Sequence, residues 1–195
     1  MKITVMKAID LLLLETEQAY RELTDTLQGI SEGHAWAVPP QDGPGYLHTS
    51  GSILEIVQHI ATCKVMYGSA AFRDTAVRWR DCAARLDAIG ADWQQNLAYL
   101  RESHDGWVAC WSALGDDELL RLRSTNWGEQ WPTWRIISTI SQHDTYHAGQ
   151  IALLHASLPA VSVPPPSHAD AIRRHLQDQS SVLYDPSAQP PPAAG

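Results

Sequence analysis

Lysine is scarce in this chain of 195 residues, where it occurs only as Lys2, Lys7 and Lys64. The 14 Lys and Arg residues are outnumbered by 22 Asp and Glu residues, so the formal net charge is −8. Binding to nucleic acids or to anionic membranes depends on clustered basic side chains. The composition therefore argues against both kinds of partner.

Long apolar runs are also missing. The longest notable run covers residues 11–14, and its length is far below the roughly 20 residues of a membrane-spanning helix. This run lacks the charged start and small-residue cleavage site of a secretory signal. The three cysteines, Cys63, Cys82 and Cys110, form no CxxC pair, which excludes a zinc ribbon and a thioredoxin-type motif. An odd number of cysteines fits a reduced protein, and we expect a cytoplasmic location.

Helical periodicity is what the sequence does contain. Apolar residues recur every three or four positions in four stretches, at about residues 5–30, 53–72, 83–114 and 133–157. Ser50 or Ser52 is expected to cap the second stretch, with Glu55 in its first turn. The third has the most regular apolar seam, which is typical of helices packed nearly parallel in a bundle. We predict an all-α protein, an up-down four-helix bundle with long loops.

The segments between and after these stretches are rich in residues that break helices. Residues 31–50 carry three prolines and three glycines and are predicted to be a loop. After Pro159 the composition changes, and the last eleven residues are mostly Pro and Ala. We therefore divide the chain into a bundle over residues 1–158 and a Pro-rich tail over 159–195. The tail is expected to hold one short helix near 169–176 and a disordered end.

The inward face of the fourth stretch is polar where apolar residues are expected. His143, His147 and Gln150 occupy three consecutive seam positions. Residues four apart share one face of a helix, so both imidazoles reach a common point. Burying such groups unpaired costs about 1–3 kcal/mol each. A divalent metal bound by two neutral imidazole nitrogens is the most direct explanation, with hydrogen-bonded core histidines as the alternative.

A third ligand is expected from the second stretch, where His59 lies beside the apolar seam. The set His59, His143 and His147 would leave coordination positions open for water or substrate, as catalytic sites do. Cys63, one turn after His59, fits either a ligand or a small core residue. His104, on the third stretch, could also reach this cavity.

Other chemistries lack their motifs. Ferritin-like di-iron sites need two Glu-x-x-His pairs, and the chain has none. HExxH, GxSxG and GxxxxGK[ST] are also absent. These comparisons exclude a ferritin-like site, a zincin, an α/β-hydrolase and a P-loop NTPase.

Two strings in the sequence resemble the DinB/YfiT-like superfamily: HDTYHAGQI at residues 143–151 and SILEIVQHI at residues 52–60. The resemblance covers roughly residues 5–158. It implies a four-helix bundle, often dimeric, that holds a divalent metal on three histidines, here His59, His143 and His147. Zinc or nickel is expected first, and iron or manganese are alternatives. Characterised relatives include transferases and isomerases that use the thiols bacillithiol or mycothiol, and members described as metal-dependent hydrolases.

The leading hypothesis is a metal-dependent enzyme acting on a small-molecule substrate. A metal-activated water or low-molecular-weight thiol would attack an electrophile. Gln150 would orient a ligand or one of the histidines. Glu55 would act as a hydrogen-bond acceptor or general base, although a Glu in the first turn of a helix also fits a simple cap.

Two loops, 31–50 and 115–132, are expected to line the mouth of the site. Indoles of the second loop and of the helix that follows would form an aromatic wall for an apolar substrate, or a lid over the end of the bundle. Neighbouring guanidinium groups could receive a carboxylate. The residues concerned are Trp127, Trp131 and Trp134, and Arg121, Arg123 and Arg135.

Two non-enzymatic hypotheses stay open. The first is a metal- or ligand-binding bundle with a role in stress response, which a fourth protein ligand from Cys63, His104 or Glu55 would favour. The second is a dry hydrogen-bonded histidine network in a bundle that acts through its surface. In that case chelators would change neither stability nor spectrum.

Overall fold

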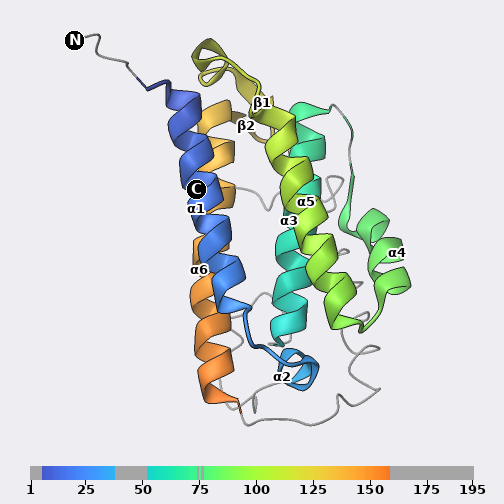
Figure 1. The fold of residues 1–195 in the computed structure, drawn as a ribbon. Coiled ribbons are helices and arrows are strands. Elements are labelled where there is room, and N and C mark those ends of the chain that lie inside the picture. Colours follow the sequence, from blue (N-terminus) through green and yellow to red (C-terminus); the bar gives the residue numbers. More distant parts are fainter. Residues whose placement is uncertain (1–5, 38–51, 74, 76, 159–195) are drawn as a thin grey trace, which may run out of the picture.

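Four long helices form the body of the computed structural model, which describes residues 6–37, 52–73, 75 and 77–158 (Figure 1). The predicted all-α bundle is confirmed. In chain order the elements are α1 (Ala8–Thr26), α2 (Glu32–Trp36), α3 (Ile53–Phe72), α4 (Trp79–Ile89), α5 (Trp93–Trp111), the 3-10 turn Asp116–Glu118, β1 (Leu122–Ser124), β2 (Gln130–Pro132) and α6 (Thr133–Ser157).

The long helices pack in two pairs, α1 along α6 and α3 along α5, and contacts between α3 and α6 join the pairs. The two helices of each pair run in the same direction (Figure 1). Near the start of α3 and α5, Gln58 Nε2 donates to Asn96 Oδ1 at 2.8 Å. Near their ends, Arg73 donates to the carbonyl oxygen of Gly106. The helices thus do not alternate strictly, and the segment containing α4 returns the chain to the end where α5 begins.

α3 begins where the sequence predicts and is the most buried helix of the bundle. Ser52 Oγ accepts the backbone N–H of Glu55 at 3.2 Å, and Glu55 Oε2 accepts the backbone N–H of Ser52 at 3.3 Å. This reciprocal capping box satisfies two N–H groups that a helix start leaves free. Nearly every side chain of the first three turns is buried, because α5 and α6 both pack against α3.

The predicted third helix, residues 83–114, is wrong as one continuous element. α4 ends at Ile89, Gly90 adopts φ 58°, and α5 begins at Trp93. Asp92 caps the new start by accepting the backbone N–H of Gln95 at 2.9 Å. A positive φ is accessible to glycine at no steric cost, which allows the chain to turn here. The apolar spacing of four and three continues across the break and so conceals it.

The other boundaries differ less from the predictions. α1 is shorter than residues 5–30. α2 lies inside the predicted loop 31–50, of which residues 38–51 fall outside the described part. The loop 115–132 contains the antiparallel hairpin of β1 and β2. α6 matches its predicted span. The tail over 159–195, with its predicted helix near 169–176, lies outside the described residues. The predicted boundary at 158/159 falls at their edge.

Indole groups close the two ends of the bundle. At one end, Trp36 Nε1 donates to the carbonyl of Ala91, and Trp93 Nε1 donates to that of Ile30, both at 3.2 Å. At the other end, the buried Trp107 and Trp111 pack with apolar residues of α1 and α6. These contacts join α2 to the α4–α5 corner and fix the ends of the helices that carry the polar interior.

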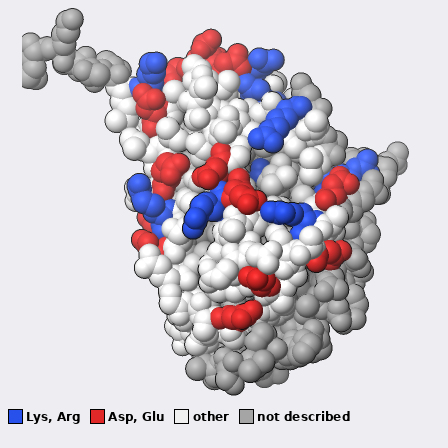
Figure 2. Space-filling model, turned by 45° about the vertical axis from the view of Figure 1, so that its right-hand side comes forward, with Lys and Arg blue, Asp and Glu red and all other residues white. Residues whose placement is uncertain are grey.

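The surface shows no separation of charge on the face seen in Figure 2, where acidic and basic side chains are interspersed. Among the helices of the described residues, none combines the length and apolarity that a bilayer span requires.

Candidate metal site

The contact between α3 and α6 brings the three predicted histidines together. His59 comes from α3, and His143 and His147 come from successive turns of α6. His59 and His147 are buried, with 6% and 2% of their surface exposed, and His143 is partly exposed. The ring centroids lie 4.3–5.0 Å apart, so the imidazoles form one cluster.

Nε2 of His143 is the atom shared by both close contacts in this cluster. It lies 3.0 Å from His59 Nε2 and 3.1 Å from His147 Nε2. Nitrogen ligands of a tetrahedral zinc ion, each about 2.05 Å from the metal, are about 3.3 Å apart. The two observed separations are close to that value. The spacing therefore fits ligands that share one ion.

Gln150 determines how His147 is protonated. Its Oε1 lies 2.6 Å from His147 Nδ1, and its Nε2 donates to the Tyr146 hydroxyl at 2.9 Å. A carboxamide oxygen only accepts hydrogen bonds, so Nδ1 of His147 carries the proton. In a neutral ring Nε2 then presents its lone pair, and Nε2 is the atom that lies against His143. Metal-ligating histidines are commonly oriented by such a contact.

In a neutral, metal-free network, a single N–H at His143 Nε2 would have to serve both of its close contacts. If His147 Nε2 is an acceptor, His143 Nε2 has to donate to it. His143 Nε2 then has no lone pair to receive a hydrogen from His59. A divalent ion that accepts the lone pairs of all three nitrogens needs no such sharing, and the donor set fits such an ion. The exact ligand set stays a prediction.

Cys63 belongs to the same cluster. One ligand atom from each of His59, Cys63 and His143 lies within 4.8 Å of the others. Cys63 Sγ is 3.7 Å from His59 Nε2, because the two residues are one turn apart on α3. Burial raises the pKa of this thiol far above its ordinary value. The group that could hold a metal thus includes Cys63, which the sequence analysis left open as either a ligand or a small core residue.

Glu55 is engaged at the start of α3. Its Oε2 accepts from both the backbone N–H and the hydroxyl of Ser52, each at 3.3 Å, and the residue is 1% exposed. These contacts are those of a helix cap. Its action as a general base stays a prediction.

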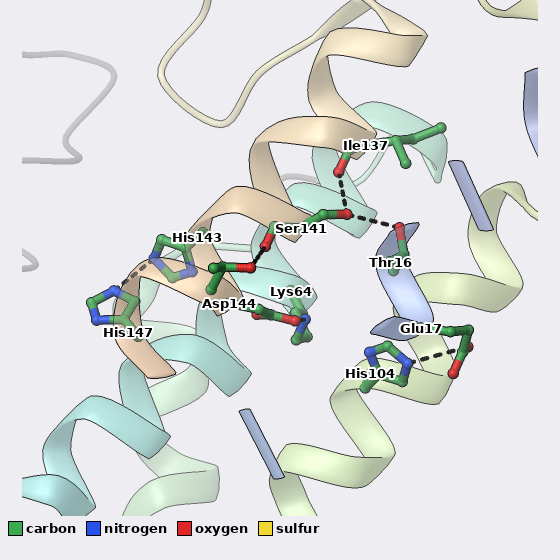
Figure 3. A network of polar contacts seen from close by, with 10 residues as sticks. Thr16, Glu17, Lys64, His104, Ile137, Ser141, His143, Asp144 and His147 are labelled. Atoms are coloured by element: carbon green, nitrogen blue, oxygen red, sulfur yellow. Dashed lines mark hydrogen bonds and ion pairs between the residues drawn. The ribbon is translucent and has the colours of Figure 1, made fainter. Parts of the chain in front are cut away.

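A buried ion pair beside the histidines was not predicted from the sequence. Lys64 Nζ and Asp144 Oδ2 are 2.5 Å apart, and both side chains are fully buried (Figure 3). Burial raises the pKa of Asp144, and the ammonium group of Lys64 opposes this rise. Two signals in the sequence were available: a lysine within an apolar helix in a chain with few lysines, and an acidic residue on the helix that carries the two histidines.

His104 of α5 contacts residues of α1, apart from the three clustered histidines (Figure 3). Its ring stacks on Tyr20 at 3.6 Å between centroids, and Nε2 lies 3.4 Å from Glu17 Oε1. Burial, and then the charge of Lys64, lower the pKa of His104 to about 3. The ring is therefore neutral at pH 7. It is not a member of the group formed by His59, Cys63 and His143.

The hairpin of β1 and β2 lies at the end of the bundle opposite α2 (Figure 1). Trp127 packs edge-on against Tyr67 and Trp131, and Trp134 is 44% exposed. His143 follows Trp131 by twelve residues, mostly helical, which corresponds to about 15 Å along α6. The arrangement is that of a lid over the bundle end, away from the histidines.

The three arginines near the hairpin have local partners. Arg121 and Arg123 both form ion pairs with Glu118. Arg135 lies 3.7 Å from the centroid of the Trp131 ring. Their guanidinium groups thus stabilise the hairpin, and a role in receiving a substrate carboxylate stays a prediction.

Comparison with known proteins agrees with this architecture. No curated protein matches the chain. A family model described as the DinB superfamily matches residues 15–151, a span that runs from α1 into α6 and includes all three histidines. The chain therefore belongs to the DinB superfamily.

Proposed function

We propose that the protein is a metal-dependent enzyme in which His59, His143 and His147 hold a divalent ion, with zinc or nickel as the first candidates. The ion would lower the pKa of a bound water or low-molecular-weight thiol, so that hydroxide or thiolate attacks a small electrophile near neutral pH. This is the chemistry of a hydrolase or a thiol transferase. The observation that carries the proposal is the pair of Nε2 separations, 3.0 and 3.1 Å, around His143.

The protein's own groups would supply orientation and access. Gln150 holds His147 with Nδ1 as a donor and Nε2 turned toward His143. His143 and Gln150 are partly exposed and Tyr146 is 55% exposed, whereas His59 and His147 are buried. We therefore expect a small molecule to approach from the side of His143, with the other two histidines fixed in the interior.

The test is the metal content per chain, measured by mass spectrometry on protein purified without a metal-affinity tag. We expect about one equivalent in the wild type and loss of the ion in His147→Ala, because one of three ligands is removed. His155→Ala on the same helix is the matched control and should keep the ion. Retention of a full equivalent by His147→Ala would contradict the ligand set.

Catalysis is then tested with the metal-loaded protein on panels of thiol-transfer and hydrolysis substrates. Turnover that requires the ion and is lost in His147→Ala is the expected result. A second candidate function, a non-catalytic metal- or ligand-binding bundle, is supported by the sulfur of Cys63 in the cluster. A fourth protein donor closes the coordination of a tetrahedral ion, whereas an ion with five ligands would keep one position open. Metal binding without turnover on either panel would favour this second function.

A further inference from the structure

Cys63 differs from the other two cysteines in what its sulfur faces. Its Sγ lies 3.7 Å from Nε2 and 4.0 Å from Nδ1 of His59. Cys110 instead donates to the carbonyl oxygen of Gly106 at 3.0 Å, within its own helix. Cys82 is buried on α4 in the apolar core. Of the three thiols, only that of Cys63 is grouped with imidazole nitrogens.

The distance from the Cys63 sulfur to the nearer nitrogen of His59 has the size that two ligands of one ion show. With zinc–sulfur and zinc–nitrogen bonds of about 2.3 and 2.05 Å, the sulfur and nitrogen ligands of a tetrahedral ion are about 3.6 Å apart. The separation between Cys63 Sγ and His59 Nε2 is 3.7 Å. The nitrogen pair His59–His143 at 3.0 Å completes a small triangle of donors within 4.8 Å of one another.

We propose that the Cys63 thiolate is a protein ligand of the ion, in addition to the histidines. Binding forms a metal–sulfur bond, and the thiol proton leaves to solvent. The proposal rests on the metal-binding part of the proposed function and holds whether the ion is catalytic or not. A sulfur donor beside imidazoles suits zinc, nickel or cobalt and disfavours manganese and magnesium, which prefer oxygen ligands. A Cys63 ligand would therefore favour zinc or nickel over manganese among the expected ions.

The experiment uses cobalt(II) as the probe. Cobalt bound to a thiolate shows a sulfur-to-metal charge-transfer band in the near ultraviolet, whereas cobalt bound to histidines alone shows only its weaker visible bands. We expect the charge-transfer band in the wild type. We also expect it in Cys82→Ala/Cys110→Ala, a double variant in which Cys63 is the only thiol of the chain.

Cys63→Ala should lose the charge-transfer band and keep the visible cobalt bands. It should also bind the ion more than about tenfold more weakly, because even the loss of a residue that only orients a ligand typically costs this much affinity. Far-ultraviolet circular dichroism checks that the variants fold. Should Cys63→Ala not fold, the double variant alone decides, because its band can arise only from Cys63.

The outcomes separate this proposal from the proposed function. Cobalt uptake without a charge-transfer band in the wild type or the double variant would overturn the thiolate ligand and leave the histidine site standing. A band that persists in Cys63→Ala would also overturn it. Failure of the wild type to bind cobalt, zinc or nickel would overturn both.

Discussion

The carboxamide of Gln150 selects which nitrogen of His147 faces the cluster. Its oxygen holds the proton of Nδ1 at 2.6 Å, and its amide nitrogen is held in turn by the Tyr146 hydroxyl. Both contacts fall within successive turns of one helix, so they form as soon as α6 does. At the scale of the residue, the chemistry of the site thus depends on local hydrogen bonds.

Replacing Gln150 by Leu should therefore weaken metal binding. Without the oxygen acceptor, the His147 ring is free to change tautomer and rotate, and loss of such a partner typically costs 10–100-fold in affinity. A competition titration of zinc against a chromophoric chelator measures the change. The control is Gln142→Leu, at an exposed position of the same helix where the side chain donates to the Ser138 hydroxyl. Equal affinities of the two variants would refute the orienting role.

Individual residues also show how far the sequence could be interpreted. His143 and His147 were recognisable because a spacing of four places two side chains on one face, whatever the helix packs against. Cys63 had two possible roles, because the same spacing from His59 suits both core packing and ligation. The Lys64–Asp144 pair was missed because it depends on the direction and offset of α3 against α6, and periodicity within one helix contains neither.

At the scale of the element, local signals predicted some boundaries and concealed others. The capping box of Ser52 and Glu55 and the span of α6 follow from residues close in sequence. The turn at Gly90 was concealed because its apolar neighbours keep the rhythm of a single helix. The start of α1 is fixed from far away in sequence, since Asp116 accepts the backbone N–H groups of Ala8 and Ile9 at 3.0 and 2.9 Å.

Asp116→Ala should lower the thermal midpoint at neutral pH, because α1 loses its cap. The two backbone hydrogen bonds lower the pKa of Asp116 below its ordinary value of 3.8. A group with a lowered pKa in the folded state stabilises above its unfolded pKa, and this contribution is lost as the pH falls through the folded pKa. The deficit of the variant should thus be full at pH 7 and shrink below about pH 4.

Thermal unfolding followed by circular dichroism between pH 3 and pH 8 measures this deficit. Asp117→Ala, at the adjacent exposed position, is the control and should follow the wild type throughout. A deficit of Asp116→Ala that stays constant over the whole range would show that the charge of Asp116 plays no part.

At the scale of the whole molecule, polar contacts run through the interior both between the two helix pairs and within one of them. Lys64 and Asp144 join α3 to α6, and Thr16 Oγ1 meets Ser141 Oγ at 2.8 Å between α1 and α6 (Figure 3). Buried charges are tolerated only when paired, so each pairing specifies one offset between its helices. Asp144 directly follows His143 in α6, and Lys64 directly follows Cys63 in α3. The offset that the ion pair specifies is therefore also that of the histidine cluster.

Lys64→Met alone should destabilise the protein by about 3–5 kcal/mol, because it leaves a buried carboxylate without its partner. Lys64→Met/Asp144→Leu should recover most of this loss, since apolar residues of similar volume replace a buried pair at little or no cost. Urea unfolding of the single variant, the double variant and the wild type gives the three free energies. A double variant no more stable than the single one would contradict the assignment of this pair as a desolvated ion pair.

The parallel arrangement within each helix pair has a consequence for the nascent chain. α3 and α5 are neighbours in sequence order among the long helices, so they can pair while the ribosome is still translating. α1 leaves the ribosome before the other helices of the described residues, yet its partner α6 is the last of them to be made. Contacts between distant segments form late, because a long loop has to close first. We therefore expect the apolar stripe of α1 to stay uncovered until α6 has been made. The two histidines of α6 then join His59 in the cluster in the same step.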